Sequence, residues 1–97
     1  MAHQRSIFRA SIHAVTRAKQ RGIKLLELEL IEEHGDRFFA EGGAYVCYMG
    51  WRAVARAFAR FGVRLDHLTN TALVIADSGV YVTTYKRSRP LRHWRAA

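Results

Sequence analysis

Hydrophobic residues between Ser11 and Ile23 recur every three to four positions, which is the spacing of an amphipathic helix. The Ser11 hydroxyl can cap the first turn, and Gly22 can adopt the left-handed conformation that ends a helix. We expect Ile12, Val15 and the alanines to face a core. A polar and mostly cationic stripe falls along one side, and it consists of His13, Arg17, Gln20, Arg21 and Lys24.

The next segment, residues 24–35, alternates leucine with glutamate as a strand would. Its Leu25, Leu28 and Ile31 also follow helical spacing. Because leucine and glutamate are strong helix formers, we predict a helix that ends at Gly35.

A third helix is predicted over residues 51–61, with arginines at every fourth position along one face. Like charges at this spacing repel by roughly 0.2–0.5 kcal/mol for each pair in an isolated helix, so an acidic partner, either glutamates or phosphates, would relieve the repulsion. The alternative is a solvated arginine face. The arginines are Arg52, Arg56 and Arg60, and the residues expected to face the core are Trp51, Val54, Ala55, Phe58 and Phe61.

Two pairs of β-rich segments, each joined by a glycine-containing turn, predict two hairpins. The segments are 37–40 with 44–48, around Glu41-Gly42-Gly43, and 71–76 with 80–85, around Asp77-Ser78-Gly79. The segment 71–76 is apolar on both faces, so we expect it to be a central strand. The alternation of 80–85 predicts one side with Val80, Val82 and Thr84 and another with Tyr81, Thr83 and Tyr85.

These elements predict an α+β fold, in which N-terminal helices pack on a small antiparallel β-sheet and an additional helix lies at about 51–61. A chain of 97 residues is long enough for one domain and too short for two. We assign residues 1–85 to this single domain. Residues 86–97 hold five cations, and we expect a basic C-terminal tail that is disordered until it binds a partner.

The chain carries 16 lysines and arginines against 8 aspartates and glutamates, which gives a formal net charge of +8. This excess indicates a polyanionic partner, either nucleic acid or an acidic protein. All but three of the cations are arginine, whose planar guanidinium suits phosphates and base edges. The N-terminus lacks the apolar core of a signal peptide and no apolar run is long enough to span a bilayer, so we expect a cytoplasmic protein without membrane contact.

The sequence shows no pattern typical of a metal or cofactor site. Cys47 is the only cysteine, which excludes an intrachain disulfide and a thiolate zinc site. No glycine-rich phosphate loop is present, and the spacing of the histidines matches no ligand pattern; they are His3, His13, His34, His67 and His93. We therefore expect no metal and no cofactor. The tyrosines can stack bases on an open sheet or pack a core, and both interpretations stay open for Tyr45, Tyr48, Tyr81 and Tyr85.

One set of residues fits metal-free cleavage of RNA. This reaction needs a base for the 2′-hydroxyl proton, cations to stabilise the phosphorane and an acid for the leaving 5′-oxygen. His13 can serve as the base or the acid, and Arg17 can stabilise the developing charge. Thr84 or Tyr85, at the end of the last strand, can position the phosphate. The candidate nucleic-acid contacts are Arg21, Lys24, Arg52, Arg56, Arg60, Lys86 and Arg87.

The chain also resembles a known group of proteins. The matching pieces are Ser11-x-His13-Ala14-x-x-Arg17-x-x-x-Arg21-Gly22-Ile23, the acidic leucine-rich helix, the short hairpin and the final strand from Val80 to Tyr85. They resemble small bacterial domains of unknown function in the superfamily of metal-independent ribonuclease toxins of the barnase, EndoU, colicin and RelE type. The resemblance implies two helices on a four-stranded antiparallel sheet, with His13, Arg17, Thr84 and Tyr85 facing a common cleft. The helix at 51–61 departs from this pattern.

The sequence thus favours an RNA-binding protein, and metal-independent cleavage of RNA at His13 is the hypothesis for its activity. Two functions of other classes remain open. One is a non-catalytic module that docks on nucleic acid or on an acidic partner, such as an acidic inhibitor protein. The other is a structural protein whose aromatic residues form a homodimer.

Overall fold

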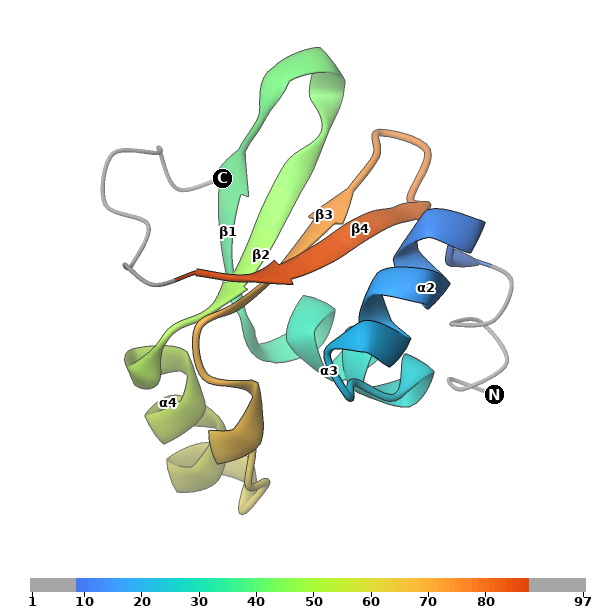
Figure 1. Ribbon diagram of the computed structural model, residues 1–97. Helices are drawn as coiled ribbons and strands as arrows, with labels where there is room; N and C mark the ends of the chain where they lie inside the picture. The colour runs from blue at the N-terminus through green and yellow to red at the C-terminus, as the bar shows by residue number, and fades with distance from the viewer. Residues whose placement is uncertain (1–8, 88–97) are drawn as a thin grey trace.

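A four-stranded antiparallel sheet organises the computed structural model, which describes residues 9–87. The strands lie in the order β1-β2-β3-β4, so that neighbours in the sheet are neighbours along the chain (Figure 1). Their bounds are Asp36–Phe39 (β1), Tyr45–Met49 (β2), Thr71–Ile75 (β3) and Tyr81–Lys86 (β4). The helices are α2 (Ile12–Gln20), α3 (Leu25–His34) and α4 (Trp51–Phe61), with short 3₁₀ turns at Glu41–Gly43 and Asp66–Leu68. The predicted α+β fold with N-terminal helices is confirmed.

The helix boundaries follow the local signals in the sequence. The Ser11 hydroxyl accepts a hydrogen bond from the Ala14 N–H at 3.0 Å, and Gly22 has a φ of 69° just after α2. Glu27 closes the start of α3, because its carboxylate accepts from the Lys24 N–H at 2.9 Å. The segment that allowed two interpretations is therefore a helix, and it ends at Gly35 as predicted.

The expected core face of α2 is partly wrong. Ala14 and Ala18 are fully buried, whereas Ile12 is 88% exposed and Val15 is half-buried. At about 100° per residue, Ile12 points away from the stripe that carries the two alanines. The stripe that faces β4 therefore carries small side chains, which let α2 pack closely on this strand.

In α4, too, small residues are buried, and the face that was expected to be buried is mostly exposed. Its buried residues are Ala53, Val54 and Ala57. Of the residues predicted to face the core, only Val54 does so, and Ala55 is exposed with the three aromatic residues, whose exposures are 65% for Trp51, 50% for Phe58 and 66% for Phe61. The helix packs through its small residues, so its large rings lie at the surface.

A β-bulge changes the predicted alternation of the last strand. Val74 pairs with Thr83 and Ile75 pairs with Tyr81, which leaves Val82 without a partner in β3. The extra residue turns Tyr81 to the same face as Thr84, where both are buried. The predicted grouping of Tyr81 with Thr83 and Tyr85 is therefore wrong. The other strand of this hairpin, β3, is a central strand as predicted, because it lies between β2 and β4.

The core lies mainly between the helices and one face of the sheet. This cluster contains Ala14 and Ala18 of α2 together with Leu73, Ile75 and Tyr81 of the sheet. The opposite face carries a smaller cluster, formed by Val46, Tyr48 and Ala72 with Phe38, Ala40, Val74 and Tyr85 packed against them. Of the predicted basic tail, Lys86 ends β4 and Arg87 follows it, and the other residues lie outside the described range.

Candidate nucleic-acid interface

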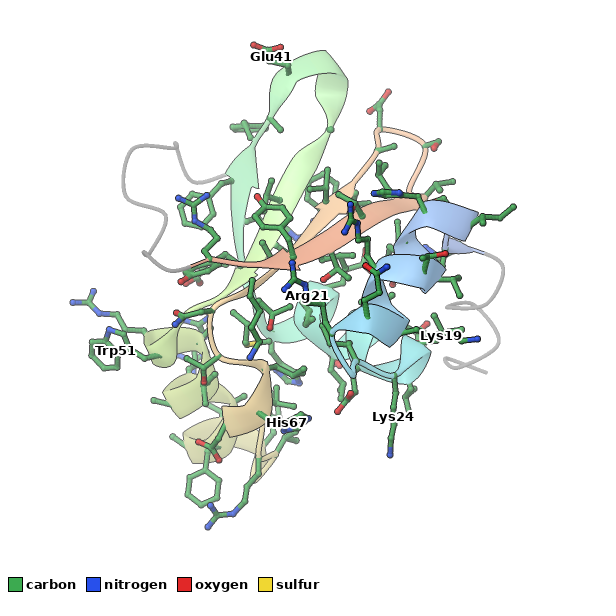
Figure 2. The ribbon with its side chains drawn as sticks, viewed as in Figure 1. Lys19, Arg21, Lys24, Glu41, Trp51 and His67 are labelled. Carbon is green, nitrogen blue, oxygen red and sulfur yellow. The ribbon has the colours of Figure 1, made fainter. Side chains whose placement is uncertain are left out.

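The cationic stripe predicted on α2 lies at the surface. His13 and Arg17 are exposed on the helix, and Arg21 and Lys24 are exposed in the turn that follows it. Within residues 9–87, Arg17 donates to the Gln20 side chain at 3.2 Å, and none of the three cations forms an ion pair. Figure 2 shows Lys24 projecting away from the sheet. Lys24 attracts Glu27 electrostatically, and all three charges are exposed to an external anion.

The structure does not bring the four proposed catalytic residues together. The Thr84 side chain is fully buried, and its hydroxyl donates to the Ala72 carbonyl at 2.8 Å. Tyr85 packs in the cluster on the face of the sheet opposite to the one that α2 covers. His13 and Arg17 therefore share a helix surface with each other but share no cleft with Tyr85.

Most of the tyrosine rings are packed against other residues and are not exposed for base stacking. Tyr48 is buried and donates to the Asn70 side chain at 2.8 Å, and Tyr81 is buried on the helix side of the sheet. Tyr45 is half-buried beneath Arg37, whose guanidinium carbon lies 4.9 Å from the centre of the ring. Of the four, Tyr85 alone lies half-exposed on the open face of the sheet.

The arginines of α4 divide into engaged and exposed residues. Arg56 is half-buried and donates to the Asp36 carboxylate at 2.9 Å and to the His34 carbonyl at 3.1 Å, so an internal acid satisfies it. Arg52 and Arg60 are exposed and have no acidic partner within residues 9–87. The predicted need of this face for an acidic partner is thus met internally at one of its three arginines.

The exposed rings of α4 are accompanied by guanidinium groups. The guanidinium carbon of Arg52 lies 5.3 Å from the centre of the Trp51 ring, and that of Arg64 lies 4.8 Å from the centre of the Phe58 ring. In Figure 2, Trp51 points away from the rest of the molecule, on the side opposite to Lys24. Sequence reasoning missed this surface because it assigned the rings to the core.

Sequence reasoning also missed a polar cluster centred on Glu32. Its carboxylate accepts two hydrogen bonds from the Arg9 guanidinium, at 2.9 and 2.8 Å, and one from the Tyr81 hydroxyl at 2.7 Å. The Tyr45 hydroxyl approaches the same carboxylate at 3.5 Å. A signal was present, because Glu32 follows Leu28 by four residues and so lies beside the buried stripe of α3.

The cluster shifts the ionisation of its members. Burial would raise the pKa of Glu32, but the hydrogen bonds from Arg9 and Tyr81 outweigh it and lower that pKa. Burial and the neighbouring Glu32 carboxylate both raise the pKa of the Tyr81 hydroxyl. Arg9 also donates to the Gly79 carbonyl at 3.0 Å. The charged cluster therefore fastens the segment before α2 to α3 and to the hairpin of β3 and β4.

Other chemistries have little support in the described part of the chain. The Cys47 thiol is fully buried, and burial raises its pKa to about 11, so it is a poor nucleophile. Within residues 9–87 no three histidine, cysteine, aspartate or glutamate side chains are grouped so that they could hold a metal ion. No helix in the same range is long and apolar enough to cross a membrane.

No family model, curated protein or solved structure matches the chain.

Proposed function

We propose that this protein binds RNA through the cationic surface formed by His13, Arg17, Arg21 and Lys24. One observation carries the proposal: most of the acids have an arginine or histidine partner in the same chain, whereas Arg17 and Arg21 form no ion pair within residues 9–87. Five of the eight acids lie within 4 Å of an arginine or a histidine, and they are Glu27, Glu32, Glu33, Asp36 and Asp66. Arg17, Arg21 and Lys24 are exposed, so their charge can attract phosphates.

The arrangement of the elements also supports the proposal. Two helices precede a four-stranded antiparallel sheet, which is the order that the resemblance to ribonuclease toxins implies, and α4 between β2 and β3 departs from that pattern. Cleavage is not part of the proposal, because Thr84 is buried and Tyr85 lies across the sheet from α2. His13 then acts as a surface contact beside the arginines rather than as an acid or base.

The test measures binding of a fluorescently labelled single-stranded RNA by anisotropy at several salt concentrations. Arg17→Ala and Arg21→Ala should each weaken binding and reduce the slope of log affinity against log salt by ~1, because each removes one phosphate contact. Lys19→Ala is the matched control, since it removes one charge from the opposite side of the same helix. Equal effects of all three variants, or no binding to RNA, would contradict the proposal.

The same samples distinguish the other functions. Polyglutamate that binds as tightly as RNA, with the same response to Arg17→Ala, would favour an acidic protein partner. RNA cleavage in the presence of a chelator, lost in His13→Ala, would restore the ribonuclease hypothesis. A monomer mass that does not change with concentration would reject the homodimer.

A further inference from the structure

The exposed side of α4 combines large rings with positive charge. Trp51 and Phe58 are 65% and 50% exposed, although their helix buries three smaller residues. They are seven residues apart, which is two helical turns, so they lie on one side of the helix about 10 Å apart along its axis. Ala55 is exposed between them and leaves the space above it open. We refer to Trp51, Arg52, Ala55, Phe58 and Arg64 as the α4 platform.

We propose that the α4 platform binds single-stranded nucleic acid, with bases stacked on Trp51 and Phe58 and phosphates held by Arg52 and Arg64. This inference rests on the proposed function and adds to it a second contact surface and a preference for unpaired strands. Aromatic faces accept any base, whereas the bases of a duplex are already stacked on one another. About three stacked nucleotides, at ~3.4 Å each, cover the distance between the two rings.

The charge of this region favours a polyanion over a second copy of the chain. Residues 50–64 contain four arginines, Arg52, Arg56, Arg60 and Arg64, and no acid. Arg56 is paired with Asp36, and Arg64 lies 3.9 Å from Asp66 in a solvent-exposed pair that a phosphate can replace. A symmetric dimer through this face would place these arginines against the same arginines of the other copy. Such pairing of like charges opposes association, whereas a phosphate backbone neutralises them.

The position of the arginines also favours nucleic acid over an anionic membrane. An interfacial helix inserts its rings below the plane of the headgroups and keeps its cations above that plane. Here the guanidinium groups of Arg52 and Arg64 lie over the faces of Trp51 and Phe58, at 5.3 and 4.8 Å from the ring centres. Insertion of the rings would carry these charges below the headgroups, but a stacked base and its phosphate use the ring and the guanidinium together.

The experiment compares single-stranded RNA with a duplex of the same sequence, using the full chain. Trp51→Ala and Phe58→Ala should each weaken binding of the single strand by about 5- to 100-fold, the range found for loss of one stacking ring. Phe39→Ala is the matched control, because Phe39 is a ring of similar exposure, 63%, on β1. Trp51→Phe should retain most of the affinity, and Trp51→Leu should not.

A second readout follows the indole directly. The chain has two tryptophans, so a Trp94→Phe background leaves Trp51 as the sole indole, and stacking should quench its fluorescence when single-stranded RNA is added. Because the substituted rings are at the surface, the variants should keep the thermal midpoint of the parent protein.

The possible failures are distinguishable. If Trp51→Ala and Phe58→Ala bind RNA as the parent does while Arg17→Ala weakens binding, the platform is refuted and the proposed function stands. If the parent binds no RNA, both are refuted. A Trp51 spectrum that responds to anionic phospholipid vesicles and not to RNA would assign the platform to membranes. A dimer that Trp51→Ala dissociates would assign it to a second copy of the chain.

Discussion

Replacement of Glu32 by glutamine tests whether the cluster of Arg9, Glu32 and Tyr81 holds the fold together. Glutamine keeps the shape of the side chain and one acceptor oxygen, but it removes the negative charge. The Arg9 guanidinium would then lose a charged partner and one of its two hydrogen bonds, now 2.9 and 2.8 Å long, and the Tyr81 hydroxyl would lose its charged acceptor at 2.7 Å.

The expected loss of stability follows from these contacts. A hydrogen bond to a charged group contributes roughly 1.5–3 kcal/mol, but the side chains of Arg9 and Glu32 keep 27% and 16% of their exposure and glutamine still accepts one bond. We therefore expect Glu32→Gln to lower the free energy of unfolding by about 2–3 kcal/mol, a large part of the ~5–15 kcal/mol typical of a domain. In a chain of this size the thermal midpoint should fall by about 10–20 °C.

The assay is thermal and urea unfolding followed by circular dichroism. Glu33→Gln is the control, because Glu33 is the next residue of α3 and its side chain is 69% exposed. A double-mutant cycle with Arg9→Gln should give a coupling energy of about 1–3 kcal/mol. If Glu32→Gln were no more destabilising than Glu33→Gln, or if the coupling were near zero, the cluster would not have the role that we assign to it.

Three further predictions concern the helix cap, the acid response and the buried thiol. Ser11→Ala should lower stability by ~1 kcal/mol in the same unfolding assay, because it removes the acceptor for the Ala14 N–H; an unchanged midpoint would show that the cap does not contribute. Burial would raise the pKa of Glu27, but hydrogen bonds from the Lys24 N–H and from His67 lower it, so the folded state resists protonation more than the unfolded state does. The stability from Glu27 should therefore be present above about pH 4.5 and lost as the pH falls below that value, and Glu27→Gln should flatten this part of a midpoint-against-pH curve. The Cys47 thiol, with its pKa raised to about 11, should react with a thiol reagent near neutral pH only after unfolding, and rapid labelling of the native protein would contradict its burial.

Features set by neighbouring residues were predictable from the sequence. The caps at Ser11 and Gly22, the end of α3 at Gly35 and both hairpins depend on the conformational preferences of a few adjacent residues. These preferences depend only on residues that are adjacent in the sequence, so they can be recognised without knowledge of the folded structure. The class of the fold followed from their order.

Features set by distant partners were not predictable in the same way. The helical spacing of α4 allows two different stripes of residues to be buried. Large hydrophobic side chains indicate one stripe, but the helix buries the other, which contains Ala53 and Ala57. The bulge at Val82 turns the Tyr81 side chain to the other face of the sheet, and no residue type in the sequence marks its position. The bond from Arg9 to Glu32 spans 23 residues, and periodicity carries no information about such pairs. For these reasons the sequence did not indicate that Thr84 is buried or that Tyr85 lies across the sheet from α2.

The attachment of the first helix to the last strand has a consequence for the order in which the chain folds. The Ser11 N–H donates to the Tyr81 carbonyl at 3.0 Å, the Ser11 hydroxyl donates to the Val82 carbonyl at 3.0 Å, and Ala10 forms a parallel bridge with Tyr81. During synthesis α2 leaves the ribosome before the strand on which it docks, because the contacting residues are 70 and 71 positions apart in the sequence. The short helix is marginal alone in water, so it stays unanchored until β4 has emerged. Any chain released before Tyr81 would expose Ala14 and Ala18 together with the unpaired edge of β3, and such a fragment is a natural target for chaperones and proteases.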